Sequence, residues 1–370
     1  MGIVQVENER VLSIQDIDIS REFVVDNNLI NEMEATGKQW TIALYTDQLL
    51  KWKDEWKRRK AISIEHTAEP PIHKRTEKDH LFTEGSIKIT ETLLSMDKVS
   101  DMSAHLNGPM NSDWDNDGNL VVPCSQAIRV IDPVTRKITK TISNRLFNDL
   151  HSVSVNKVTG KILVTSPGPG KILEVDPVTG NIDWEWDADK FVIKHKGIEE
   201  SVLKARNEYF TEDVDYRTLK IETSGQATHV NTATWIDDRK FGVSLFHQGT
   251  ILVVDRHTGQ SSVVLENLKK PHGFQPIDLG NDHRFIVTDT GNGAVWLLNK
   301  DLQPNLRLYG FFKNHPQDEI SWLHTTFSCG DKLIALDQTQ GEFILLDPQG
   351  KRKQVIQHNP NWKVSYISRN

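Results

Sequence analysis

The chain has 370 residues, of which 37% are hydrophobic and 26% charged, a composition that supports a sizeable core and excludes an intrinsically disordered protein. Its formal net charge of −7 argues against a protein that binds nucleic acid through overall charge. No run of about 18 apolar residues predicts a transmembrane helix, and the start of the sequence lacks the pattern of a secretory signal.

The two cysteines, Cys124 and Cys329, are too few for a disulfide framework, and they lack the spacing of a zinc knuckle. A reducing compartment suits such a chain. We therefore expect a cytoplasmic protein whose partners are neither nucleic acid nor a membrane.

Residues 1–104 differ in character from the rest of the chain and form a predicted N-terminal extension. The segment 46–60, TDQLLKWKDEWKRRK, begins with the capping residues Thr46 and Asp47 and carries leucine and tryptophan at helical spacing. This pattern predicts an amphipathic helix. The remaining residues, 105–370, form the predicted main domain, and whether the extension also supplies a part of that domain stays open.

A repeated hairpin organises the main domain. In each copy an apolar strand ends in a polar residue, a tight turn follows, and a second strand begins, as in LEVDPVTGNIDWEW. The polar residues at this position are Asp132, Asp176, Asp255, Asn299 and Asp347. A second hairpin precedes each copy, as in KVTGKILVTS and DDRKFGVSL, so the whole unit has four short strands.

Four strands in about 40–50 residues are typical of the blade of a β-propeller. We therefore predict an all-β fold with five readable blades between residues 107 and 357. A sixth blade before residue 105, closed by the C-terminal strand WKVSYIS, stays open. The interval between the second and third blades is too long, and its residues 188–226 include the helix-like segment KGIEESVLKARNEYF. This predicts a helical insertion, which either shapes the entrance to a binding site or lies on the surface without a role in binding.

Histidines occur at the same position of successive blades, at the start of the first strand. The first strands of a propeller line its central channel, so these side chains are expected to converge on the axis. The four histidines are His151, His229, His272 and His324, and Asn111 has this position in the first blade.

Neutral imidazoles are good ligands for iron, copper, manganese and zinc, so the four histidines are predicted metal ligands. A single imidazole also serves as a general base or nucleophile, and we predict His272 and His229 as catalytic residues. Alternatively, the histidines hydrogen-bond to the inner strands and hold the blades together. The residues predicted to contact a substrate are Asn111, Asn231, Phe246, His247 and Asp289.

Part of the chain resembles the arylsulfotransferase-like β-propellers. The run THVNTATWIDDRKFGVSLFHQGTILVVDRHTG (228–259) is similar to their His-x-Asn…Ser-x-x-His-Gln…Asp-x-x-Thr-Gly pattern, and the segments 149–186 and 270–293 resemble the blades on either side. The resemblance covers about residues 145–295. It implies that His229 and His272 are axial ligand contacts and that His272 is the nucleophile of a group transfer. The family has an arginine just before its His-Gln pair, where this chain has Phe246.

Three functional hypotheses follow. The first is an enzyme for a small-molecule substrate with a transition metal at the axial histidines, since four imidazoles without an arginine suit a cation better than an anion. The second is a group transferase with His272 as nucleophile. The third is a non-catalytic propeller that binds a protein or peptide on one face.

Overall fold

The structure is a computed structural model of the chain, and the description below is confined to the residues whose placement is well defined. These are residues 10–13, 41–46, 72–75, 84–90, 102–107, 110–135, 137–195, 200–279, 282–312, 321–329, 332–346, 353–357 and 363–369. The predicted helix at 46–60 lies outside them, apart from Thr46.

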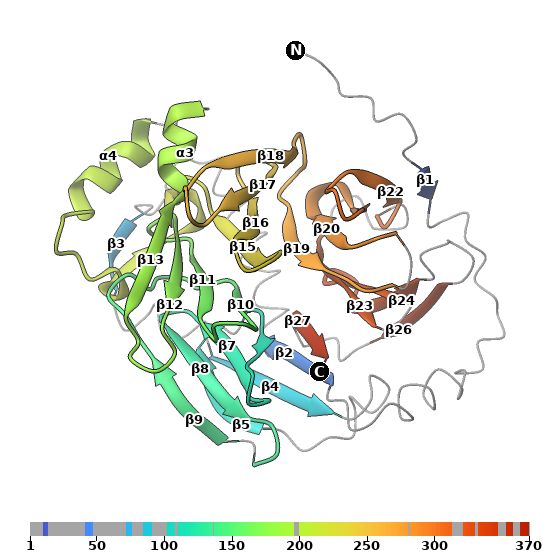
Figure 1. Cartoon of the computed structure of the whole chain (residues 1–370), viewed down its shortest axis with the longest axis horizontal. Coiled ribbons are helices and arrows are strands. Elements are labelled where there is room, and N and C mark those ends of the chain that lie inside the picture. The colour runs from blue at the N-terminus through green and yellow to red at the C-terminus, as the bar shows by residue number, and fades with distance from the viewer. Residues whose placement is uncertain are drawn as a thin grey trace, which may run out of the picture.

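Five antiparallel four-stranded sheets follow one another along the chain (Figure 1). The first blade holds β6 (Asp113–Trp114), β7 (Leu120–Cys124), β8 (Ala127–Asp132) and β9 (Lys137–Ile142). The second holds β10 (Val153–Val155), β11 (Ile162–Ser166), β12 (Lys171–Val175) and β13 (Ile182–Asp187). The third holds β15 (Val230–Trp235), β16 (Lys240–Leu245), β17 (Thr250–Asp255) and β18 (Ser261–Leu265).

The fourth blade holds β19 (His272–Pro276), β20 (Phe285–Asp289), β21 (Ala294–Leu298) and β22 (Pro304–Tyr309). The fifth holds β23 (Leu323–Cys329), β24 (Lys332–Asp337), β25 (Glu342–Leu346) and β26 (Lys353–Gln357). The first strands β6, β10, β15, β19 and β23 contact one another in series, so they form the inner ring. The chain is a β-propeller, as the repeats predicted.

A sixth four-stranded sheet joins the two ends of the chain. It contains β27 (Lys363–Arg369), β2 (Thr41–Thr46), β4 (Glu84–Thr90) and β5 (Met102–Asn107), in this order. The C-terminal strand β27 pairs antiparallel with β2 and packs beside the inner strand β23. The possible sixth blade is therefore present, and the C-terminal strand β27 is its innermost strand.

Two short strands of the N-terminal region join other parts of the fold. Strand β1 (Arg10–Ser13) runs parallel to β22 and adds a fifth strand to the fourth sheet. Strand β3 (Ile72–Lys74) pairs with β14 (Leu219–Ile221), which lies in the predicted insertion.

The repeated aspartates explain why the hairpins form. In the second blade, an oxygen of the Asp176 carboxylate accepts hydrogen bonds from the amides of Val178 (2.7 Å) and Thr179 (2.8 Å). Gly180 closes the turn at φ +76°, a conformation in which glycine has no steric cost. These bonds to the charged form, together with Lys161, hold the pKa of Asp176 well below its usual value. Asn299 has this role in the fourth blade, where its side-chain oxygen accepts from the amides of Asp301 and Gln303, and Asp347 of the fifth blade lies outside the described residues.

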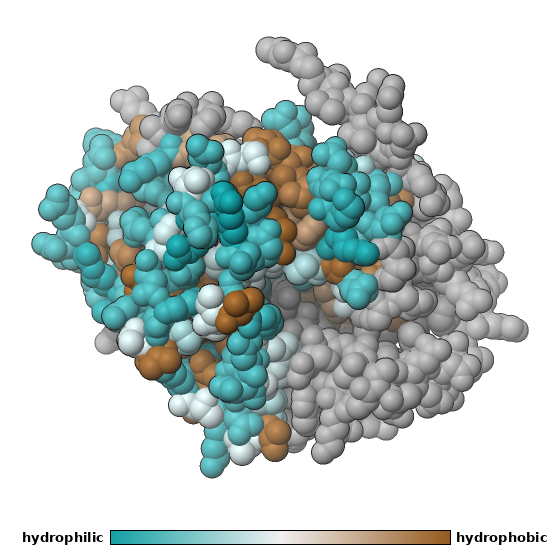
Figure 2. Space-filling model, viewed as in Figure 1, coloured by the Kyte–Doolittle hydropathy of each residue, from teal (hydrophilic) through white to brown (hydrophobic). Residues whose placement is uncertain are grey.

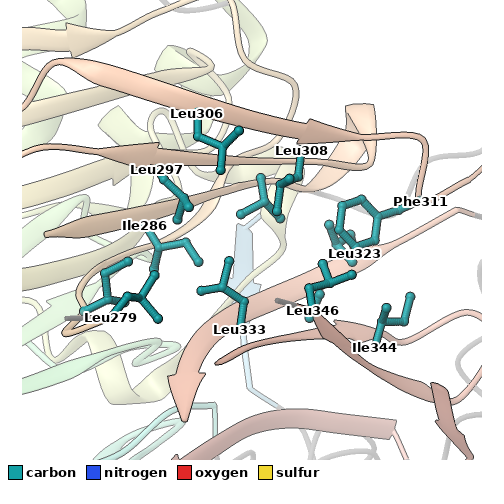
Figure 3. Packing of buried hydrophobic residues seen from close by; sticks show 13 residues of the cluster. Leu279, Ile286, Leu297, Leu306, Leu308, Phe311, Leu323, Leu333, Ile344 and Leu346 are labelled. Carbon is teal, nitrogen blue, oxygen red and sulfur yellow. The ribbon is translucent and has the colours of Figure 1, made fainter. Parts of the chain in front are cut away.

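The hydrophobic core lies between neighbouring blades. Between the fourth and fifth blades, Ile286, Leu297 and Leu306 face Leu333 and Leu346 in one buried cluster (Figure 3). The described part of the surface in Figure 2 is mostly hydrophilic, with scattered apolar residues. Burial of the strand faces thus holds the sheets side by side around the axis.

Hydrogen bonds between inner strands supplement this packing. The side chain of one inner strand accepts a bond from the backbone amide of the next. The pairs are Asn111 with Val153 (2.8 Å), Asp113 with Val155 (2.7 Å), Ser152 with Ala233 (3.0 Å), Ser154 with Trp235 (3.2 Å) and Thr232 with Phe274 (3.2 Å). These bonds pair edge amides of β10, β15 and β19, as buried amides require.

The insertion packs against the second and third blades. Helix α3 (Ala188–His195) and helix α4 (Glu200–Tyr209) are joined by a buried ion pair between Asp189 and Arg206. Asp189 also accepts a hydrogen bond of 2.8 Å from the hydroxyl of Thr228, the residue before His229. The helical segment is therefore tied to the start of β15. No helix within the described ranges is long and apolar enough to cross a membrane.

Candidate axial histidine site

The four predicted histidines lie at the starts of four neighbouring inner strands. His151 precedes β10, His229 precedes β15, His272 begins β19, and His324 is the second residue of β23. All four are buried, with 4–9% of their surface exposed. The repeat register therefore brings them to the same end of the channel.

The imidazole rings form two touching pairs. The rings of His151 and His229 meet edge to face with centroids 4.7 Å apart, and those of His272 and His324 lie 4.9 Å apart. The ring of Phe246 lies between the pairs, 4.7 Å from His229 and 5.3 Å from His272. The predicted substrate contact Phe246 is thus an apolar bridge within the cluster.

Hydrogen bonds fix the tautomers of His151 and His272. The Nδ1 atom of His151 lies 2.6 Å from the carbonyl oxygen of Asp149, and that of His272 lies 3.1 Å from the carbonyl of Lys270. A carbonyl oxygen only accepts, so both contacts call for a proton on Nδ1, while Nδ1 of His272 also lies 2.9 Å from the hydroxyl of Thr290, which can donate or accept. In a neutral ring with this tautomer, Nε2 has the lone pair that binds a metal or accepts a proton.

His229 is oriented through a side-chain network. The amide nitrogen of Gln226 donates to a carboxylate oxygen of Asp149 (2.9 Å) and to the carbonyl of Ile221 (3.2 Å). This turns the Gln226 oxygen toward His229, whose Nδ1 donates to it. His229 therefore has the same tautomer as His151. The sequence offered no signal for Gln226, because it reaches the site from the end of the insertion.

The charges in this network differ between the histidine and the carboxyl group. Burial lowers the pKa of His229 well below its usual value, and the neighbouring histidines lower it further, so the ring is neutral. Burial alone would raise the pKa of Asp149, but the charges of His151 and Lys220 and the bond from Gln226 bring it below its usual value. The site therefore combines the neutral imidazole of His229 with the anionic carboxylate of Asp149.

Asp149, His151 and His229 have ligand atoms within 4.8 Å of one another. One carboxylate and two imidazoles, each held by a second hydrogen bond, form a donor set that suits a first-row transition metal. Asp149 and His229 have positive φ angles of 57° and 43°, an uncommon conformation for residues with side chains. Asp149 was not among the residues predicted from the sequence, although it lies only two residues before His151.

His272 and His324 line a small cavity together with His151. Its volume is about 20 Å³, which holds a single water molecule or ion. The side-chain nitrogen of Asn231, also predicted to contact a substrate, is buried at this cavity and has no hydrogen-bond partner among the described residues. A small acceptor in the cavity would satisfy this donor.

The remaining predicted substrate contacts have structural partners. Asn111 lines the small cavity, but its oxygen accepts the bond from Val153. A ring nitrogen of His247, Nε2, lies 2.9 Å from the carbonyl of Thr223 in the insertion, while the ring lies 5.8 Å from that of His229. Asp289 is buried and accepts bonds from the Lys269 amide (2.8 Å) and Asn292 (2.9 Å), so it shapes a turn beside the site.

A second, larger cavity of about 480 Å³ lies at the opposite ends of the inner strands. Trp114, Lys157 and Asp237 are among its lining residues, and it shares Asn111 and Gln275 with the small cavity. The two cavities therefore adjoin along the channel. The larger one has room for the body of a small molecule.

Comparisons with known proteins support the fold and leave the family open. No family model matches the chain, and no curated protein matches it. Solved structures do, including a chain of a nidogen/laminin complex at TM-score 0.53 and 12% identity, over 78% of this chain and 95% of that chain. A protein of unknown function from Bacteroides caccae matches at TM-score 0.50 and 13% identity, over 77% and 94% of the chains. Such likenesses show the propeller fold alone.

Proposed function

We propose that this protein is an enzyme for a small-molecule substrate, with a transition-metal centre at the axial histidines. The observation that carries the proposal is that the Nδ1 atoms of His151, His229 and His272 each lie within hydrogen-bond distance of a carbonyl oxygen, that of Asp149, Gln226 or Lys270. Histidines that bind a metal through Nε2 have this kind of support at Nδ1.

Asp149, His151 and His229 would hold the metal, because their ligand atoms already lie together. His272 and His324 lie beside them across Phe246 and complete the predicted four-histidine set. When bound, iron, copper, manganese or zinc supplies Lewis-acid or redox chemistry.

The other residues of the site have binding and orienting roles. The free donor of Asn231 would bind an acceptor atom of the substrate in the small cavity. Nε2 of His272 is the proposed general base, because Nδ1 contacts the Lys270 carbonyl and, at 2.9 Å, the hydroxyl of Thr290. Phe246 excludes water between the two histidine pairs.

Metal content is the direct test. The full-length protein purified without added metal should contain near-stoichiometric iron, copper, manganese or zinc by elemental mass spectrometry. The double variant His151→Ala/His229→Ala should lose it, and the exposed His257→Ala should keep it. Absence of metal from the unaltered protein, even after incubation with each of the four metals, would contradict the proposal.

The second candidate function is group transfer with His272 as nucleophile, as the arylsulfotransferase-like resemblance implies. The fixed Nε2 lone pair of His272 supports it. Intact-protein mass spectrometry after incubation with an activated aryl phosphate or sulfate would then detect an adduct that His272→Ala abolishes. A metal-free protein with this adduct would favour the second candidate over the first.

The third candidate is a propeller that binds a protein. It is supported by the similar fold of a chain that was crystallised in a nidogen/laminin complex. A protein partner that binds the unaltered protein and His229→Ala/His272→Ala equally well would favour this scaffold function.

A further inference from the structure

We propose that Lys270 recognises an anionic group of the substrate and that the histidine site therefore takes an organic anion with a flat apolar body, such as an aromatic carboxylate. The inference rests on the proposed function for the location of the site, but it does not depend on the metal. It concerns the side of the site formed by Phe246, His272 and Trp322.

These three rings form an aromatic wall beside the histidine pairs. The ring of His272 lies 5.3 Å from Phe246 and 5.3 Å from Trp322, and the last two lie 6.1 Å apart. The ammonium group of Lys270 lies 5.9 Å from the centre of Phe246 and 5.4 Å from that of Trp322. A flat apolar molecule on this wall would have its charged end beside the ammonium group.

The backbone holds Lys270 in this place. Its φ angle of 54° is in the left-handed region, and its carbonyl accepts the bond from Nδ1 of His272. The preceding residue, Lys269, is fixed on both sides, because its amide donates to Asp289 (2.8 Å) and its carbonyl accepts from Gly291 (2.7 Å). The strained conformation therefore couples the position of the ammonium group to the orientation of His272.

Lys270 is an exposed residue, so an anion from solvent can reach it. Two further cations, Arg75 and Lys220, act on Asp149 at the His151 side of the site.

The alternative is that the lysine stem merely covers the rings, as long side chains often do. A titration of the metal-free, full-length protein separates the two roles. Benzoate is the anionic probe and benzyl alcohol is its neutral counterpart, with binding followed by ligand-detected NMR. We compare the unaltered protein with Lys270→Gln, Lys270→Arg and the matched control Lys269→Gln, which removes the neighbouring charge outside the ring wall.

We expect benzoate to bind more tightly than benzyl alcohol, and Lys270→Gln to weaken benzoate about tenfold, the usual scale of a lost charge-assisted contact. Lys270→Arg should retain most of the binding, Lys269→Gln should change it little, and benzyl alcohol should be unaffected by each. Equal losses in Lys270→Gln and Lys269→Gln, equal binding of the two probes, or no benzoate binding at millimolar concentrations would each overturn the proposal. Because the titrated protein contains no metal, a negative result would overturn the proposed anion site without bearing on the proposed metal centre.

Discussion

The side-chain nitrogen of Gln226 lies 2.9 Å from a carboxylate oxygen of Asp149, although 77 residues separate them in the chain. This contact joins the end of the insertion to the start of the second blade. It also turns the Gln226 oxygen toward His229. The insertion thus has a direct part in setting the tautomer of one proposed metal ligand.

Gln226→Ala should therefore weaken metal binding without removing a ligand. Loss of a supporting hydrogen bond to a ligating histidine typically lowers metal affinity about 10–100-fold. Competition with a chelator of known affinity measures the change. The exposed Gln260→Ala serves as control. Unchanged affinity in Gln226→Ala would show that the network does not support a metal.

A second prediction concerns the buried ion pair of the insertion and its dependence on pH. Burial raises the pKa of Asp189 to about 6, even though Arg206 opposes the shift. Between about pH 4 and pH 6 the folded state thus keeps a proton that the unfolded state loses. The contribution of Asp189 to the free energy of unfolding therefore falls as pH rises through this window.

Urea unfolding of the unaltered protein and of Asp189→Asn, from pH 4 to pH 7, measures this slope. Asparagine has no such titration, so the stability of the unaltered protein relative to the variant should decrease with rising pH and level off above about pH 6. A constant difference across the whole range would mean that Asp189 titrates at the same pH in both states.

Close packing between the third and fourth blades gives a third prediction. A Cβ atom at Gly242 in β16 would lie 2.1 Å from the ring of Phe274, which is fully buried in β19. Gly242→Ala should destabilise the protein by about 1–3 kcal/mol, the usual cost of overpacking. The double variant Gly242→Ala/Phe274→Leu should recover part of this loss in thermal unfolding. Additive effects of the two changes would contradict the predicted clash.

The sequence predicted the parts of the fold that depend on repetition. The repeated strand-end position of Asp132, Asp176 and Asp255 located the hairpins, and the blade register placed the four histidines at one end of the channel. Contacts that do not repeat from blade to blade could not be predicted from the sequence. Asp149 and His229 lie close together with positive φ angles at both residues, a conformation too uncommon outside glycine to be expected from the sequence.

Residue identity also failed to distinguish roles within the site. Asn111 and Asn231 were both predicted to contact substrate, yet Asn111 accepts the amide of Val153, whereas the nitrogen of Asn231 is unpartnered. The difference depends on which backbone amide each side chain meets across the blade interface. The sequence likewise offered no signal for Lys270, because its proposed role depends on the rings of Phe246 and Trp322 beside it.

The central claim is that axial histidines present their Nε2 lone pairs to a metal, and ¹⁵N NMR of the histidine side chains tests it most directly. In the metal-free protein, the side chains of His151, His229 and His272, assigned by single substitution, should carry a proton on Nδ1. Addition of one equivalent of Zn²⁺ should shift the Nε2 signals of His151 and His229 while their Nδ1 protons remain. A proton on Nε2 in these rings, or no change on adding Zn²⁺, would contradict the account.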